Sequence, residues 1–134
     1  MIGIVICTHS NFADGLKDAC NMIMGSEQEN LVSLGFTNED ELLDFSSQLA
    51  VLTKDFTDGC IYVVDLVNAS PFNAALLCIA HTDNIVLTGA SLPLMLELLT
   101  LRNTITSPSE LAKKIVENSR MYVEIKRSKD VFGQ

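Results

Sequence analysis

Ile2-Gly-Ile-Val-Ile-Cys-Thr-His9-Ser10 is an apolar run of strand type that ends abruptly in a histidine. Apolar residues at helical spacing begin directly after it, so His9 is predicted to lie at the N-terminus of a helix. The backbone N–H groups and the dipole of a helix N-terminus attract anions. This run therefore places a titratable nucleophile where an anionic group can bind.

A second apolar run, Cys60-Ile-Tyr-Val-Val-Asp65, ends in a carboxylate. It is followed by Asn68-Ala-Ser70-Pro71, in which serine before proline is typical of a helix start. His9 and Asp65 are thus predicted to occupy equivalent ends of two strands.

Strands and helices are predicted to alternate along the chain, which indicates βαβ units. Strand-like runs rich in Val, Ile or Leu lie near 2–7, 30–35, 60–65 and 84–88, and a helical pattern follows each one. We therefore expect an α/β fold in one domain spanning 1–134: a doubly wound, mostly parallel sheet with helices on both faces. Ligands of such sheets gather where the strand order reverses. If the first and third strands flank that reversal, His9 and Asp65 meet across the crevice.

Polar residues are predicted to cap the later helices. Asn38 with Glu41 forms a candidate capping box for a helix that runs to Phe56, and serines precede proline or apolar residues at 70, 91 and 107. The alternating segment 121–125 has strand propensity, which favours a late edge strand, and the polar tail 126–134 is expected to be loosely held.

Composition narrows the functional class. The formal net charge of -8 argues against a nucleic-acid partner. Apolar runs fall far short of the roughly 20 residues that span a bilayer, and no secretory leader is recognised, so a soluble, cytoplasmic protein is expected. The four scattered cysteines are interpreted as reduced core residues, and no metal site is predicted. Because glycine-rich nucleotide-binding loops are also missing from the sequence, no cofactor is predicted.

The pairing of His9 with Asp65 suits phosphoryl transfer. A neutral imidazole is a good nucleophile, and an aspartate that accepts from one ring nitrogen presents the other outward. Ser10, Asn68 and Ser70 are the candidate phosphate-binding residues, since hydroxyls and amides at helix starts stabilise phosphoryl oxygens. The alternative interpretation is structural: His9 could be a loop hydrogen-bonder, Asp65 a cap, and Ser70 a plain helix start.

Several motifs together resemble the mannose-type enzyme IIA domains of the bacterial phosphotransferase system. They are Gly-Ile-Val-Ile-x-x-His at the first strand, Met22-Ile23-x-Gly25, Val64-Asp65-Leu66-x-x-x-Ser70-Pro71-Phe72-Asn73, and Gly89-x-x-Leu92-Pro93-x-x-Leu96-Glu97. The resemblance runs from the first strand to about residue 120.

The resemblance implies a phosphocarrier in which His9 takes a phosphoryl group from the carrier protein HPr and passes it to a IIB domain. Asp65 matches the family's histidine-orienting aspartate, and Ser70 matches the serine near the phosphoryl group. The resemblance further implies a homodimer in which a C-terminal strand, here 121–125, crosses to the neighbour. Contact with the membrane is expected only through IIC and IID subunits, and the transported sugar is not encoded in this chain.

Two departures from the family pattern define the alternatives. Family members usually carry glycine after the histidine and Phe-Gly-Gly before Ser-Pro, whereas this chain has Ser10 and Val67-Asn68-Ala69. Asparagine tolerates a left-handed backbone better than alanine does. One alternative is therefore a regulatory or low-activity IIA-like domain. Another is the phosphocarrier subunit of a dihydroxyacetone kinase, which His-Ser in place of His-Gly resembles.

Overall fold

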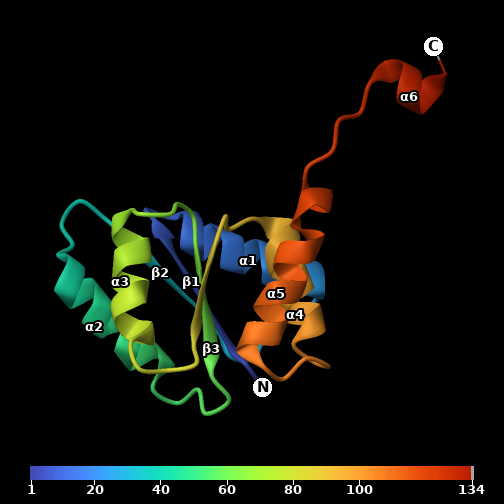
Figure 1. Ribbon diagram of the computed structural model, residues 1–134. Helices are drawn as coiled ribbons and strands as arrows, with labels where there is room; N and C mark the ends of the chain where they lie inside the picture. The colour runs from blue at the N-terminus through green and yellow to red at the C-terminus, as the bar shows by residue number, and fades with distance from the viewer. Residues whose placement is uncertain (134) are drawn as a thin grey trace.

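The computed structural model describes residues 1–133, in which four strands alternate with helices (Figure 1). The strands are β1 (Gly3–His9), β2 (Leu31–Phe36), β3 (Cys60–Val64) and β4 (Ile85–Thr88). The helices are α1 (Phe12–Met24), α2 (Leu42–Thr53), α3 (Ser70–Ile79), α4 (Leu92–Leu101), α5 (Pro108–Asn118), the 3₁₀ helix η1 (Ser119–Tyr122) and α6 (Ser128–Phe132).

The strands form one parallel sheet in the order β2-β1-β3-β4. From β1 the chain winds first toward β2 and then back across β1 to β3 and β4, so the order reverses between β1 and β3. The predicted doubly wound α/β fold is confirmed, and the first and third strands do flank the reversal. Both central strands are almost entirely buried, as expected for a sheet covered on both faces.

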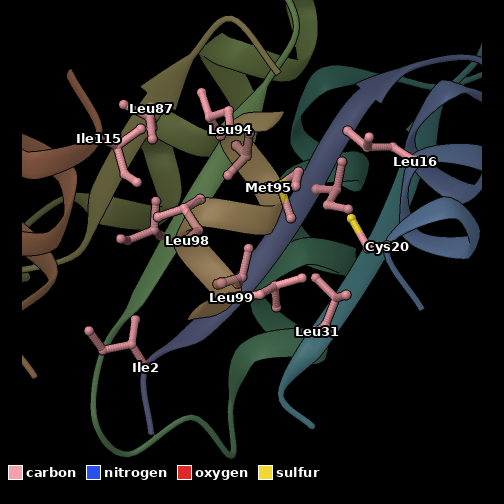
Figure 2. Close-up of a cluster of buried hydrophobic side chains, with 14 of the residues drawn as sticks. Ile2, Leu16, Cys20, Leu31, Leu87, Leu94, Met95, Leu98, Leu99 and Ile115 are labelled. Carbon is pink, nitrogen blue, oxygen red and sulfur yellow. The ribbon is translucent and has the colours of Figure 1, made fainter. Parts of the chain in front are cut away.

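Helices cover both faces of the sheet: α2 and α3 lie on one, and α1, α4 and α5 lie on the other (Figure 1). Successive side chains of a strand point to opposite faces. In β1, Ile4 and Ile6 join the core under α1, α4 and α5, whereas Val5 and Cys7 join the core under α2 and α3. Figure 2 shows the first of these cores, with Leu16, Leu98 and Ile115 among its side chains. His9 shares the parity of Cys7, so its side chain leaves the sheet on the α2 and α3 side.

Arg102, which follows α4, ties together the beginnings of β1 and β2 at the opposite end of the sheet. Its buried guanidinium donates to the carbonyl of Ile2 at 3.0 Å and to those of Glu29 and Asn30. The Nη1 and Nη2 donors are paired in this way, which offsets much of the cost of burying the charge, whereas Nε has no hydrogen-bond partner within the described residues. The far end of the sheet is therefore fixed independently of the loops that follow the strands.

Two predicted helix starts change in detail. α2 begins at Leu42 rather than near Asn38 and ends at Thr53, because Asp40 accepts from the Thr37 N–H at 2.7 Å and holds 37–40 as a turn. Ala69 is the N-cap of α3, and Ser70 is its first helical residue. The other two serine caps are confirmed by hydrogen bonds that the hydroxyls accept from the Leu94 and Glu110 N–H groups.

The predicted edge strand at 121–125 is not formed within this chain. Residues 119–122 form η1, and the Tyr122 hydroxyl donates to Glu97 of α4 at 2.7 Å. After α5 and η1, the chain extends away from the body toward α6 (Figure 1). Strand propensity alone does not make a strand, because a strand needs a neighbouring edge to pair with. The tail expected to be loosely held forms the short helix α6, whose side chains are all exposed, and residue 134 lies outside the described residues.

Replacing Leu98 by alanine should destabilise the fold by about 2–5 kcal/mol, because a buried side chain is lost and a cavity remains. Leu98 of α4 is 0% exposed. Leu43 of α2 is 70% exposed, so Leu43→Ala is the matched control and should change the free energy of unfolding by less than about 0.5 kcal/mol. Chemical denaturation measures both, and equal effects of the two substitutions would contradict the assignment of the core.

Candidate functional site

His9 and Asp65 meet where the order of the strands reverses. His9 is the last residue of β1, and its Nδ1 lies 2.8 Å from Oδ2 of Asp65, which follows β3. The same carboxylate oxygen accepts from the backbone N–H of His9 at 3.1 Å, and Oδ1 accepts from the Leu66 N–H at 3.0 Å. The predicted meeting of these two side chains across the crevice is confirmed.

The carboxylate of Asp65 is the charged partner in this pair. Its side chain is 17% exposed, against 44% for that of His9. Burial acts to raise the pKa of Asp65, but the hydrogen bonds from the His9 ring and backbone, together with the attraction of the ring, hold it below its ordinary value. An ionised carboxylate can only accept, so the Nδ1 of His9 donates to it. In the neutral ring, this tautomer places the lone pair on Nε2.

Two left-handed residues shape the loops around this pair. Ser10 has φ 53° and Asn68 has φ 62°, and both are exposed. Such a backbone is uncommon outside glycine and persists where the surroundings fix it. Ala69 is extended, with φ -104° and ψ 175°, so alanine meets no left-handed requirement at that position.

Ser70 opens α3 at the same edge of the sheet and is half-buried. The Cys7 thiol of β1 contacts the Pro71 carbonyl at 3.8 Å, which ties the first turn of α3 to the strand that carries His9. Burial raises the pKa of Cys7 to about 12, so this thiol is packing rather than a nucleophile. Ser10, Asn68 and Ser70 therefore all follow β1 or β3 at the end where His9 and Asp65 lie.

An apolar rim at this edge was missed by reasoning from the sequence. Phe12 at the start of α1 is 46% exposed, and Leu66 and Val67 after β3 are 60% and 59% exposed. Large apolar side chains left in the open at one edge are typical of an interaction surface. The available signal was position, since Leu66 and Val67 come directly after Asp65 and before the next helix. Phe12 was expected in the apolar stripe of the first helix, so its exposure could not be predicted.

Among residues 1–133, no group of three or more His, Cys, Asp or Glu side chains is placed to hold a metal ion. Within the same residues, no helix has the length and apolar character required to cross a membrane. His81, the second histidine, follows α3 and is exposed.

Comparison with known proteins decides the family. The family model for the PTS system fructose IIA component, EIIA-man, matches residues 3–119. The chain belongs to this family. It is thus a mannose/fructose-type EIIA component of the phosphotransferase system (PTS), as the motifs around His9 and Asp65 indicate.

Relatives of the EIIA chain include curated proteins and solved structures. This chain is 35% identical over 135 residues to the PTS system mannose-specific EIIAB component of Escherichia coli (strain K12), and the alignment covers 97% of this chain but 41% of that protein. It is 30% identical over 105 residues to the PTS system fructose-specific EIIA component of Bacillus subtilis (strain 168), covering 76% of this chain and 71% of that one. The crystal structure of phosphotransferase system component EIIA from Streptococcus agalactiae superposes with a TM-score of 0.85 at 26% identity, covering 93% of this chain and 97% of that one.

The Asp65 carboxyl should titrate below the ordinary aspartate pKa of about 3.9. His9→Ala should raise this pKa, because the hydrogen bond from the ring that lowers it is lost while the burial that raises it remains. A carboxyl with a lowered folded-state pKa stabilises the fold above its unfolded value, and this contribution is lost as the pH falls through the folded pKa. Unfolding of Asp65→Asn should therefore depend less on pH in the acidic range than unfolding of the unsubstituted protein.

Carbon-detected NMR titration of the carboxyl and denaturation between neutral and acidic pH measure these two effects. Asp18→Asn, at an exposed position on α1, is the control and should leave the pH dependence of stability unchanged. An Asp65 carboxyl that titrates at or above its ordinary value would contradict the geometry.

Proposed function

We propose that this EIIA chain is a phosphocarrier that accepts a phosphoryl group from phosphorylated HPr on His9 and passes it to a IIB domain. The observation that carries the proposal is the 2.8 Å hydrogen bond between His9 Nδ1 and Asp65 at the point where the strand order reverses. Residues 1–134 act as a single phosphocarrier domain, and the transfer takes place in the cytoplasm.

In the proposed transfer, the lone pair on His9 Nε2 attacks the phosphorus atom of phosphorylated HPr. A bond forms between Nε2 and phosphorus, while the bond between phosphorus and HPr breaks and its electron pair stays with HPr. The ring of His9 then carries positive charge, which the Asp65 carboxylate on the Nδ1 side stabilises. Attack by the IIB acceptor reverses these changes and returns the lone pair to Nε2. The step requires no cofactor, since the phosphoryl group passes between protein side chains.

We propose that Ser10, Asn68 and Ser70 bind the oxygens of the phosphoryl group. Phosphoryl transfer depends on positioning and on stabilising the charge of the equatorial oxygens, which hydroxyl, amide and backbone N–H donors provide. The left-handed conformations of Ser10 and Asn68 supply the loop shape that the family usually obtains from glycine. This supports an active carrier over a domain that has lost transfer.

The donor and the acceptor are proposed to dock on the apolar rim formed by Phe12, Leu66 and Val67. These side chains are exposed at the edge from which the phosphoryl group must be received and delivered. Contact with the membrane is proposed to occur only through the IIC and IID subunits that receive the phosphoryl group downstream.

We also propose a homodimer in which 121–125 pairs with the outer edge of β4 in a second copy. That edge has no neighbouring strand within residues 1–133, and a groove of about 450 Å³ lies between β4 and α5, lined partly by Val86, Leu87 and Val116. Val123 and Ile125 alternate and are 85% and 82% exposed. An extended segment with alternating apolar side chains suits the open edge of a sheet.

Incubation with HPr, enzyme I and labelled phosphoenolpyruvate should give the protein a label that is lost in acid and stable in alkali, as expected of a phosphohistidine. His9→Ala should abolish the label, and Asp65→Asn should slow its formation because the orientation of the ring is lost. His81→Ala is the matched control, because His81 is the second histidine and lies after α3, and it should be labelled normally. Label that survives His9→Ala would refute the proposal.

The double substitution Val123→Asp with Ile125→Asp should convert the proposed dimer to a monomer, because carboxylates cannot be buried unpaired in the groove beside β4. Light scattering coupled to size exclusion measures the mass. Met22→Asp on α1, at a side chain that is 84% exposed, is the control and should leave the mass unchanged. A doubly substituted protein that remains dimeric would exclude this interface.

A further inference from the structure

Gly35 of β2 lies against the turn that follows His9. In the parallel register of β1 and β2, Gly35 is the partner of Thr8 and Phe36 is the partner of His9. A Cβ atom at position 35 would overlap the carbonyl oxygen of Ser10. Because that contact is with backbone rather than with a flexible side chain, any residue other than glycine at position 35 would force the Ser10 carbonyl to move.

Both peptide groups of Ser10 are consequently fixed by β2. The Ser10 N–H donates to the Phe36 carbonyl at 2.8 Å, and the Ser10 carbonyl packs on Gly35. Ser10 is left-handed, with φ 53°, which persists in a residue other than glycine only where the surroundings fix it. The edge strand β2 supplies that restraint, although it contributes no side chain to the pair of His9 and Asp65.

The direction of the Ser10 carbonyl sets the direction of the next N–H. In a trans peptide the C=O and N–H bonds point to opposite sides, and no cis peptide occurs in the described residues. The Ser10 carbonyl is directed toward β2, so the Asn11 N–H is directed away from β2. β3 and Asp65 lie on the other side of β1 from β2.

We propose that Gly35 is a positioning residue for phosphoryl transfer, because it lets β2 hold the Ser10–Asn11 peptide with its carbonyl away from His9 and its N–H toward the phosphoryl group. The inference rests on the proposed function of His9. A carbonyl oxygen turned toward a phosphoryl group would repel it, whereas an N–H stabilises the developing negative charge. A reversal of one peptide therefore changes the site from attractive to repulsive.

The residue at position 10 determines how strongly Gly35 matters. Serine has a narrow range of left-handed conformations, whereas glycine adopts many with positive φ. With glycine at 10, the carbonyl could move aside from an alanine at 35 while the N–H kept its direction. Gly35 and Ser10 should therefore be energetically coupled, and Ser10→Gly should rescue Gly35→Ala.

The test compares Gly35→Ala, Ser10→Gly, the double substitution and the control Gly15→Ala, whose added Cβ would meet nothing within 4 Å. For Gly35→Ala, kcat for acceptance from phosphorylated HPr should fall by about 10²-fold with KM unchanged, as expected when one donor is misplaced. The double variant should recover the kcat of Ser10→Gly alone, in which only the Ser10 hydroxyl is lost, and Gly15→Ala should match the unsubstituted protein. In the absence of any phosphoryl donor, the NMR signal of the Asn11 amide should shift in Gly35→Ala and return in the double variant.

Unchanged kcat and an unchanged Asn11 signal in Gly35→Ala would overturn the inference, as would a double variant no better than Gly35→Ala. If Gly35→Ala is too unstable to assay, thermal midpoints of the four proteins form a double-mutant cycle, and additive effects at positions 10 and 35 would overturn it instead. The amide signal and the cycle need no phosphoryl transfer. If the unsubstituted protein accepts no label, the proposed function fails while these two readouts still decide the role of Gly35.

Discussion

The hydrogen bond between the His9 ring and the Asp65 carboxylate depends on one constraint, which is that β1 and β3 are neighbours in the sheet. The two residues are separated by 56 positions in the chain, with β2, α1 and α2 between them. They meet because the chain first winds toward β2 and then returns across β1 to β3. The buried Val and Ile residues of the two central strands fix this arrangement, so the geometry of the site is a consequence of how the core packs.

The loops at this edge depend on the sheet for conformations that their own residues disfavour. Ser10 is held left-handed by its hydrogen bond to the carbonyl of Phe36 and by the absence of a side chain at Gly35, so β2 shapes the turn that follows His9. The contact between Cys7 and Pro71 sets the first turn of α3 against β1 in a similar manner. Three neighbouring strands therefore contribute to the site. β1 ends in His9, Asp65 after β3 orients the His9 ring, and β2 fixes the peptide that follows His9.

Membership of the EIIA family accounts for the part of the chain that ends with α5, since the family match covers 3–119. The chain spans 41% of the length of the mannose-specific relative from Escherichia coli, so the remainder of that protein has no counterpart in these residues. Beyond α5 the chain leaves the body at Tyr122 and exposes Val123 and Ile125 (Figure 1). This is also the region in which the single chain differs most from what its local sequence predicts.

The sequence determined the features that rest on local physics. The strand runs are continuous apolar segments, Ser91 and Ser107 have the cap chemistry that their helices use, and the polar residues His9 and Asp65 stand directly at strand ends. The position of His9 relative to Asp65 could be expected only conditionally, because strand order is a property of long-range packing. The sequence predicted the start of α2 near Asn38, but the helix begins at Leu42, because the side chain of Asp40 closes a turn that competes with the predicted capping box.

Only the tertiary structure decided the features that arise between distant segments. Glycine within a strand is unfavourable by local propensity, and the structural reason for Gly35 is seen only where the Ser10 carbonyl lies against it. Segment 121–125 has the composition of a strand, yet within residues 1–133 it pairs with no edge of the sheet, because backbone hydrogen bonding needs a partner within reach, which composition cannot supply. Local propensity thus fixed the elements and their polar ends, whereas packing of the sheet fixed which of those ends meet.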